Sequence, residues 1–379
     1  MAQDTEGGIV LVGGGHAHVL ALLDLAAAGL GPSVTLVSPQ RLTPYSGMLP
    51  GHIAGLYRHD EIHIDLDALC RRTGASWRKA AAAGLDRPDR AVLLADGERV
   101  PYRVASFDVG IEPDLSAIAG AAGHAVPVKP IAGLLPRLDA MRTAVREGAG
   151  ETRIVVVGGG AAGVELALAL QARLRSDLKD GGGSGRGVRT RLVASSGLVP
   201  TLAPRARRLA ADALARAGVD VADGRRVVAI GADHVELDDG ARLPADFAIV
   251  STTARAPAWL ATLGLPVAPD GALVVGPTLQ CEGETGVFAA GDCAFMAHAP
   301  REKAGVFAVR QGPVIAANLA AALRGGALQR FMPQELFLVL LSTADGRAIA
   351  ARGDLAYAGR PAWWLKDWID RRFMARFRA

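Results

Sequence analysis

The sequence predicts an α/β protein with two domains of the same design, and two observations carry this prediction. An apolar strand runs into three glycines at 9–15, and the same pattern recurs at 154–160. Each glycine turn opens a helix rich in alanine and leucine, and the chain between the turns is long enough for a complete sheet. Since strand, glycine turn and helix form the pyrophosphate-binding unit of dinucleotide-binding domains, we expect two Rossmann-like domains.

Length and composition agree with this fold and exclude other classes. A chain of 379 residues is longer than one hydrophobic core usually supports. Its composition, 50% hydrophobic and 21% charged residues, is ordinary for a globular protein. The acidic residues at 1–6 argue against a signal peptide, and no run reaches the about 18 apolar residues of a membrane span. Three scattered cysteines fit a reducing compartment. We therefore expect a cytoplasmic protein.

The elements follow one another in the order that this fold requires. After each glycine turn the pattern indicates a helix and then a second strand, which makes a parallel βαβ unit. Glycine and serine at 180–187 indicate a mobile surface insertion. The predicted helices are 17–28, 127–148, 161–178 and 204–217, and the predicted strands are 9–12, 34–37, 92–94, 104–109, 154–157 and 190–194.

The domain boundaries follow from a block at 273–323 that has no glycine turn of its own. We expect this block to fold back onto the first domain, which then comprises 1–125 and 272–325. The second domain, 126–271, is inserted into it. Residues 326–379 form a small α+β tail that alternates at 336–341 and ends in a basic, aromatic helix.

The two glycine turns are unequal. Gly158, Gly160 and Gly163 match the dinucleotide fingerprint in full, whereas Gly13 and Gly15 are followed by His18 in place of the third glycine. His18 must point away or separate helix from strand. A packing or capping role is expected for it and for His16, because two residues apart on a helix they diverge too far to share a metal.

Neither unit ends its second strand with the acidic residue that usually binds a ribose. Ser38 ends that strand in the first unit and 194–196 reads Ala-Ser-Ser in the second, so NADH and NADPH both remain open as donors. Three arginines could meet a 2′-phosphate, although the solvated face of the next helix is the favoured explanation for them. They are Arg205, Arg207 and Arg208.

A second sequence motif lies at 286–294, where an apolar strand ends in a glycine bend followed by Asp292. This segment resembles the second FAD signature of the two-dinucleotide-domain flavoproteins, the FAD/NAD(P)-dependent pyridine nucleotide-disulfide oxidoreductases with a glutathione-reductase-like fold. The resemblance implies FAD in the first domain, with Asp292 on the ribityl chain, and NAD(P)H in the second, with Glu165 near the nicotinamide. It assigns Gly13, Gly15, Ser38, Arg41, Tyr45, Gly110, Gly291 and Asp292 to FAD, and Gly158, Gly160, Gly163 and Glu165 to NAD(P)H.

The segment 43–50 lacks the redox cysteines that dithiol reductases carry beside the flavin, which excludes a thiol relay and disfavours a sulfide:quinone reductase. It is similar to that of type II NADH dehydrogenases. Four segments, 44–51, 128–130, 308–313 and 364–373, more closely resemble oxidoreductases found beside or fused to selenide, water dikinase. The resemblance leaves the acceptor open, as a quinone or another small molecule.

Two residues are candidates for groups near the isoalloxazine, Lys129 and Gln311. The resemblance places a helix start after Gly305, aimed at the flavin, whereas Pro313 favours a start further along the chain. No metal is expected: the stretch 59–63 reads as a strand entrance, and Asp intervenes where a zincin needs Glu directly after the first His.

The tail helix carries Trp364, Leu365, Trp368, Ile369, Phe373 and Phe377 on one side, with Lys366, Arg371 and Arg378 elsewhere. Such a helix binds a membrane interface, or docks on its own protein or in a homodimer. The +4 charge concentrates here, which argues against nucleic-acid binding. The expected function is an FAD-dependent NAD(P)H oxidoreductase. The alternative is a redox-sensing or partner-binding flavoprotein with slow turnover, associated with selenium metabolism.

Overall fold

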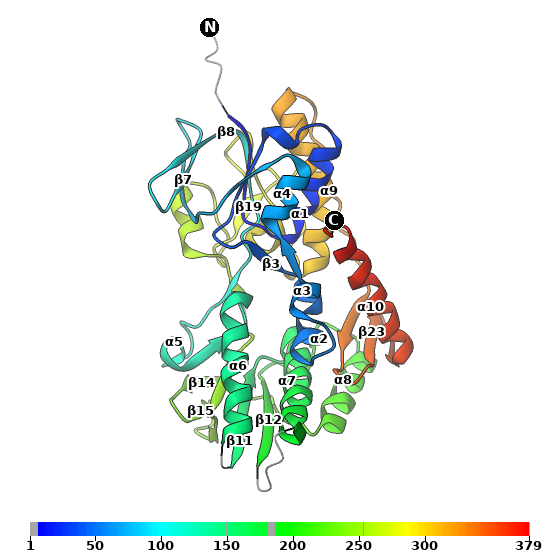
Figure 1. Ribbon diagram of the computed structural model, residues 1–379. Coiled ribbons are helices and arrows are strands. Elements are labelled where there is room, and N and C mark those ends of the chain that lie inside the picture. Colours follow the sequence, from blue (N-terminus) through cyan, green and yellow to red (C-terminus); the bar gives the residue numbers. More distant parts are fainter. Residues whose placement is uncertain (1–6, 149, 181–185, 253, 379) are drawn as a thin grey trace.

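The computed structural model describes residues 7–148, 150–180, 186–252 and 254–378. Its first sheet runs in the order β5-β2-β1-β8-β7-β6, with β20 (Val287–Ala289) pairing in parallel with β8 (Figure 1). Residues from the far end of the chain thus complete the sheet begun at β1. The other strands are β1 (Gly8–Val12), β2 (Val34–Val37), β5 (Ser76–Arg78), β6 (Ala82–Asp86), β7 (Ala91–Leu94) and β8 (Arg99–Phe107).

Two helices cover this first unit and pack against each other, α1 (His16–Ala27) and α9 (Gly305–Arg324). Strand β1 is buried on both faces, which is why its sequence is continuously apolar rather than alternating. Among the described residues, α9 is long and apolar enough to cross a membrane by length and composition only, a test that a buried core helix also passes. Its Ile315 and Leu319 are fully buried against the fold.

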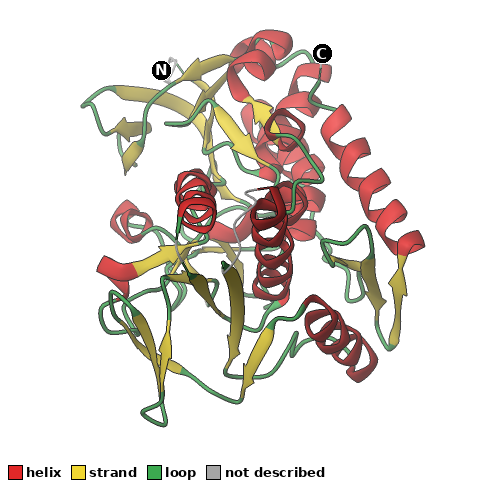
Figure 2. Cartoon of the chain, turned by 60° about the horizontal axis from the view of Figure 1, so that its bottom comes forward, coloured by secondary structure: helices red, strands yellow, loops and turns green. Residues whose placement is uncertain are grey.

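The second unit is a five-stranded parallel sheet in the order β10-β17-β11-β12-β13 (Figure 2). The predicted strand, glycine turn and helix correspond to β11 (Glu151–Val157) and α7 (Ala161–Asp180). The remaining elements are β10 (Ala125–Pro127), α6 (Ile131–Glu147), β12 (Gly187–Ala194), α8 (Pro204–Ala217), β13 (Asp220–Asp223), β17 (Phe247–Val250) and an antiparallel sheet of β14 (Val227–Ile230), β15 (His234–Leu237) and β16 (Arg242–Pro244).

The two chain segments that join the units pair with each other. Strand β9 (Glu112–Pro113) lies antiparallel to β18 (Ala254–Arg255), and Arg255 forms an ion pair with Asp114 at 3.6 Å. The connections therefore form one short ribbon between the two sheets.

The C-terminal segment contacts both units. Its sheet of β22 (Val339–Ser342), β23 (Ala348–Arg352) and β24 (Leu355–Gly359) packs on α8, where Ala206 meets Ala351 and Ala356. Its helix, α10 (Arg360–Ala375), runs along the first unit (Figure 1). The remaining short elements are η1 (Gly31–Ser33), β3 (Leu42–Pro44), η2 (Ser46–Met48), α2 (Leu49–Ile53), α3 (His59–Ile62), β4 (His63–Asp65), α4 (Leu66–Thr73), α5 (Ala121–His124), η3 (Ala258–Leu263), β19 (Leu273–Val275), η4 (Gly291–Cys293) and β21 (Ala294–Met296).

Two local expectations are corrected by the structure. The stretch at 59–62 is a helical turn, α3, rather than a strand entrance, because Glu61 accepts a bond from the Arg58 amide and caps the turn. In α10 the predicted apolar side is divided: Phe373 is buried, whereas Trp364 and Trp368 are exposed. The predicted insertion at 180–187 falls largely on 181–185, which lie outside the described residues, as do residues 1–6.

Candidate active site

The first glycine turn joins β1 to α1 in a conformation that requires its glycines. Gly13 has φ +95°, and its amide donates to the carbonyl of Val37 at 2.8 Å. A Cβ on Gly13 would lie 2.3 Å from the carbonyl oxygen of Asp108, so no larger residue fits. The turn is thereby held between β2 and the residue that follows β8.

His18 occupies the position of the missing third glycine, and its imidazole lies between helix and strand. The ring is fully buried, with Nδ1 2.8 Å from the carbonyl of Gly13 and Nε2 2.8 Å from the hydroxyl of Ser106. Burial lowers its pKa to about 4, so the neutral ring donates through Nδ1 and accepts through Nε2. A polar bridge thus replaces the close contact that a glycine would allow.

Asp108 is a site residue that the sequence reasoning missed. It follows β8, and its side chain accepts from the amides of Ala17 at 2.9 Å and His18 at 3.2 Å, at the N-terminus of α1. Burial raises its pKa to about 7. The sequence signal for Asp108 was weak. An acidic residue after a strand indicates a binding site only once β8 is known to lie beside β1.

Asp292 lies in the turn η4 after β20, and both catalytic candidates meet it there. Lys129 Nζ lies 2.9 Å from Asp292 Oδ2, and Gln311 Oε1 accepts from the amide of Gly291 at 2.7 Å. Lys303 adds a bond to the carbonyl of Asp292 at 2.7 Å. Lys129, 163 positions away from Asp292 in the sequence, therefore meets Lys303 and Gln311 at one turn.

A small cavity borders this turn and the start of α9. Its lining includes Gly291, Asp292, Met296, Lys303, Ala304 and Gln311. Helix α9 begins at Gly305 and continues through Pro313, so the start implied by the family resemblance is correct and the one based on Pro313 is wrong. The positive end of a 20-residue helix therefore faces the cavity, which suits a ligand that gains negative charge.

The second glycine turn fits a pyrophosphate group. Gly158 has φ +122°, and a Cβ on Gly163 would lie 1.8 Å from the Gly158 carbonyl oxygen, so helix α7 packs closely on the turn. A Cβ on Gly160, in contrast, would meet no atom within 4 Å. The structure thus leaves space above the second glycine, where a phosphate approaches the backbone in dinucleotide-binding folds.

Glu165, the fifth residue of α7, faces the C-terminal segment. Its Oε1 accepts from the amide of Ser342 at 2.7 Å. Burial raises its pKa to about 7, opposed by the nearby charge of Lys366. The residue expected beside the nicotinamide thus also ties the second unit to β22.

The other residues assigned to FAD surround the first unit's carboxyl edge. The Ser38 hydroxyl donates to the Gln40 carbonyl at 3.1 Å, and exposed Arg41 forms an ion pair with Asp65 at 2.7 Å. Gly110 has φ +79° with open space at its Cβ position. Tyr45 donates to Asp370 at 3.2 Å and its ring stacks on Phe373, with centroids 4.5 Å apart.

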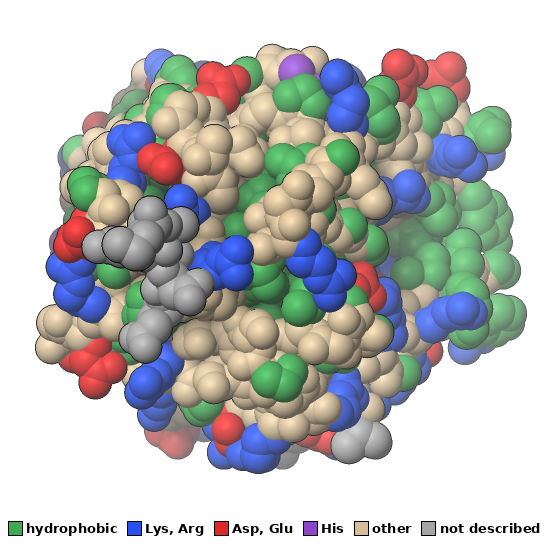
Figure 3. Space-filling model, turned by 90° about the horizontal axis from the view of Figure 1, so that it is seen from above, with side chains coloured by type: hydrophobic (Ala, Val, Ile, Leu, Met, Phe, Trp, Pro, Cys, Tyr) green, Lys and Arg blue, Asp and Glu red, His purple; other side chains and the backbone are tan. Residues whose placement is uncertain are grey.

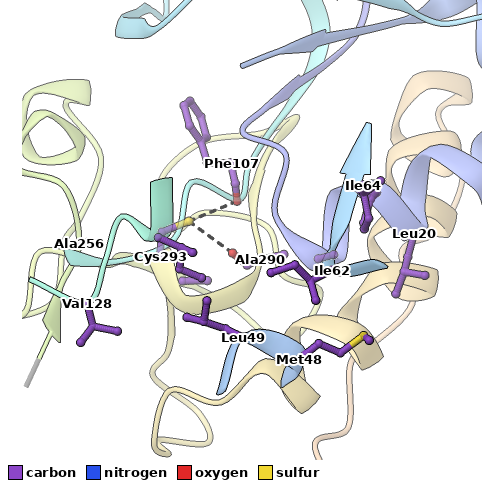
Figure 4. Close-up of a cluster of buried hydrophobic side chains, with 14 of the residues drawn as sticks. Leu20, Met48, Leu49, Ile62, Ile64, Phe107, Val128, Ala256, Ala290 and Cys293 are labelled. Atoms are coloured by element: carbon purple, nitrogen blue, oxygen red, sulfur yellow. Dashed lines mark hydrogen bonds between the residues drawn. The ribbon is translucent and has the colours of Figure 1, made fainter. Parts of the chain in front are cut away.

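The segment at 43–50 contains no cysteine. All three cysteines are buried and free, and the Cys293 thiol lies against the carbonyls of Phe107 and Ala290 (Figure 4). Burial raises its pKa to about 12, so it is a packed thiol without thiolate character. Within the segment, Met48 and Leu49 are buried apolar side chains of the hydrophobic core.

Of the three arginines expected near the ribose of the second site, one is already hydrogen-bonded to backbone carbonyls. Arg207, on α8, donates to the carbonyls of Leu202 and Pro200 in the loop before that helix. Asp223 ends β13 beside the end of β12, and its Oδ1 would lie 3.8 Å from a Cβ on Gly197.

Comparison with known proteins gives one family and one fold. The family model described as pyridine nucleotide-disulphide oxidoreductase, whose members use FAD and NAD(P)H, matches residues 7–312. A demethylphylloquinone reductase, NdbB of Synechocystis, is 25% identical over 368 residues, covering 92% of this chain and 88% of the relative.

Two solved structures share the fold across 98% of this chain. The sulfide:quinone oxidoreductase of Aquifex aeolicus superposes with a TM-score of 0.81 at 17% identity, covering 91% of that chain. NDH2 of Plasmodium falciparum in complex with NADH superposes with a TM-score of 0.79 at 13% identity, covering 97% of that chain. This protein belongs to the pyridine nucleotide-disulphide oxidoreductase family and is an FAD-dependent NAD(P)H dehydrogenase of Rossmann-like α/β fold.

Proposed function

We propose that this protein takes hydride from NAD(P)H at the second glycine turn, through FAD at the first, and delivers the electrons to a quinone or another small acceptor without a dithiol. The convergence of Lys129, Gln311 and α9 on the turn at Asp292 carries the proposal. FAD, when bound, supplies the two-electron centre between donor and acceptor.

Some residues at the turn bind the cofactor, and others stabilise negative charge. The Asp292 carboxylate is an acceptor for a hydroxyl group of the cofactor chain, and Gln311 holds the turn through the Gly291 amide. The Lys129 cation and the N-terminus of α9 favour negative charge in the neighbouring cavity. They need no proton transfer to do so.

We assign the binding site of the electron acceptor to an aromatic cluster at the segment 44–51. The cluster consists of His16, Tyr45 and Phe373, whose ring centroids lie 4.5–6.1 Å apart. A flat, weakly polar acceptor such as a quinone suits these aromatic side chains. The Synechocystis relative is named as a demethylphylloquinone reductase, which supports a quinone as the electron acceptor.

A peripheral membrane contact through the C-terminal segment belongs to the same proposal. Trp364 and Trp368 are 63% and 56% exposed, and exposed Leu355, Tyr357 and Leu365 belong to the same segment. Hydrophobic side chains gather at this edge of the molecule beside Lys and Arg residues (Figure 3). Tryptophan with arginine at an exposed helix fits the interface of an anionic membrane.

The decisive experiment is anaerobic reduction by NADH and by NADPH, followed by a panel of acceptors that includes quinones and selenium compounds. Rapid reoxidation by a quinone supports the proposed enzyme. A reduced flavin that persists with every acceptor supports the alternative of a slow redox-sensing protein. Reoxidation only by a selenium compound would favour the resemblance to oxidoreductases associated with selenide, water dikinase. A purified protein without flavin absorbance contradicts both functions.

A further inference from the structure

Asp108 joins the two turns that the proposed function assigns to FAD. Its Oδ2 accepts from two amides at the start of α1, and its backbone carbonyl accepts from the Gly15 amide at 3.2 Å. Oδ1 points between the turns: a Cβ on Gly15 would lie 2.3 Å from it, and a Cβ on Gly291 would lie 2.2 Å from it. The two glycines therefore lie on either side of one carboxyl group.

This position coincides with the place where the fold binds a pyrophosphate. The first amides of a helix have no partner inside the helix and attract anions. Asp108 takes those of Ala17 and His18, so a pyrophosphate at this turn lies beside a carboxyl group rather than on an empty helix end. Two anionic groups in one buried site repel each other strongly, unless one of them is neutralised.

We propose that Asp108 is a positioning residue of the FAD site that holds the two turns together and takes up one proton when the FAD pyrophosphate binds. This inference rests on the proposed placement of FAD. It deepens that placement, because the cofactor affinity then depends on the proton concentration.

The surroundings of Asp108 raise its pKa even without a ligand. Burial is the main cause of its raised pKa of about 7, and the Asp292 carboxylate adds to it, while the amides of His18 and Ala17 oppose it. The nearby cations are engaged elsewhere, since Lys129 pairs with Asp292 and Lys303 with Asp270. The titratable groups on the packed elements are His16 and His18 on α1, and Asp292 and Cys293 in η4.

The direction of the effect follows from linkage. Above pH 7 the ligand-free protein holds Asp108 as a carboxylate, so binding with uptake of one proton weakens as the pH rises. The FAD dissociation constant should increase about tenfold per pH unit between pH 7.5 and 9. Asp108→Asn keeps an oxygen acceptor for the two amides but carries no charge, so its affinity should not change with pH.

The test measures FAD binding to flavin-depleted protein by fluorescence quenching from pH 6.5 to 9. Asp24→Asn, which removes an acid further along α1, serves as the matched control and should keep the wild-type pH dependence. Titration calorimetry of the wild type at pH 8, in two buffers of different ionisation enthalpy, counts the protons directly. About 0.9 proton taken up per FAD is expected from a pKa of about 7.

A pH-independent affinity in the wild type, the same slope in Asp108→Asn, or no proton uptake would overturn the inference. These outcomes leave the proposed function intact, since FAD would still bind. Failure to bind FAD at any pH would instead contradict the proposed function itself. The calorimetric measurement uses the unaltered chain, so it decides the question even where the variant fails to fold.

Discussion

Lys366 and Asp370 form an ion pair across one turn of α10, with Nζ and Oδ2 2.8 Å apart, although each residue is only 4–5% exposed. Lys366 also donates to the Gly47 carbonyl at 2.7 Å, and Asp370 accepts from the Tyr45 hydroxyl. The helix is therefore held on the segment 44–51 by a compensated pair of charges, and Trp364 and Trp368 remain available to solvent or a partner.

Loss of one member of this pair should be costly. Lys366→Met leaves Asp370 buried without its cation, which should lower the free energy of unfolding by about 3 kcal/mol. Urea denaturation followed by circular dichroism measures the change. Lys79→Met, at an exposed position, is the control and should change stability little. Equal losses in the two variants would show that the pair is not a specific contact.

The loss of stability at acidic pH should depend on His18. Its pKa is lowered to about 4 from 6.5, so the unfolded chain binds this proton first as the pH falls. The stability contribution is therefore complete above pH 6.5 and is lost as the pH falls through about 4. The stability difference between wild type and His18→Gln should shrink by about 3 kcal/mol between pH 7 and pH 4. Comparing the two proteins cancels the opposite contributions of Asp108 and Glu165, whose pKa values are raised. A constant difference would mean that His18 is protonated in the fold.

Lys129 should set the potential of the bound flavin. Lys129→Met removes the cation paired with Asp292, which lines the cavity, so reduction, which adds negative charge there, becomes less favourable. We expect the midpoint potential to fall by about 30 mV or more, which is tenfold in a two-electron equilibrium. Equilibration with a reference dye measures it, with Lys79→Met as the remote control. An unchanged potential would restrict Lys129 to holding Asp292.

The second glycine turn offers a paired test of binding against folding. Gly160→Ala places a methyl group in open space, so the fold should keep its melting temperature, while the KM for NAD(P)H should rise about tenfold or more. Gly163→Ala would bring its Cβ to 1.8 Å from the Gly158 carbonyl oxygen and should destabilise the fold. Gly123→Ala, also with room for a methyl group, is the neutral control. A normal KM in Gly160→Ala would place the pyrophosphate elsewhere.

The exposed tryptophans should carry any lipid binding. Replacing Trp364 and Trp368 by serine should abolish sedimentation with phosphatidylserine vesicles while leaving turnover with a soluble quinone unchanged. Val267→Ser changes an apolar side chain that is 38% exposed elsewhere on the protein and should have no effect. Wild-type protein that fails to sediment would leave the helix to a protein partner.

The features predicted correctly from the sequence are those with a local signal. The glycine turns and the strand before Asp292 are contiguous patterns, so they indicate the two units and the turn at η4. Asp108 could not be predicted, because its partners lie 90 and 91 positions away and β8 had to be placed beside β1 first. The faces of α10 were misjudged for a related reason: Lys366 and Asp370 neutralise each other, so hydrophobicity alone misplaced them.

The paired connections β9 and β18 restrict how the two dinucleotide sites can move apart. Because both connections pair in one ribbon, a movement of one unit relative to the other has to bend or break that ribbon. On another side, the Glu165 contact with Ser342 and the docking of α10 act as a clasp between the same units. Any opening that admits or releases a nicotinamide must therefore either strain this clasp or carry the C-terminal segment with it.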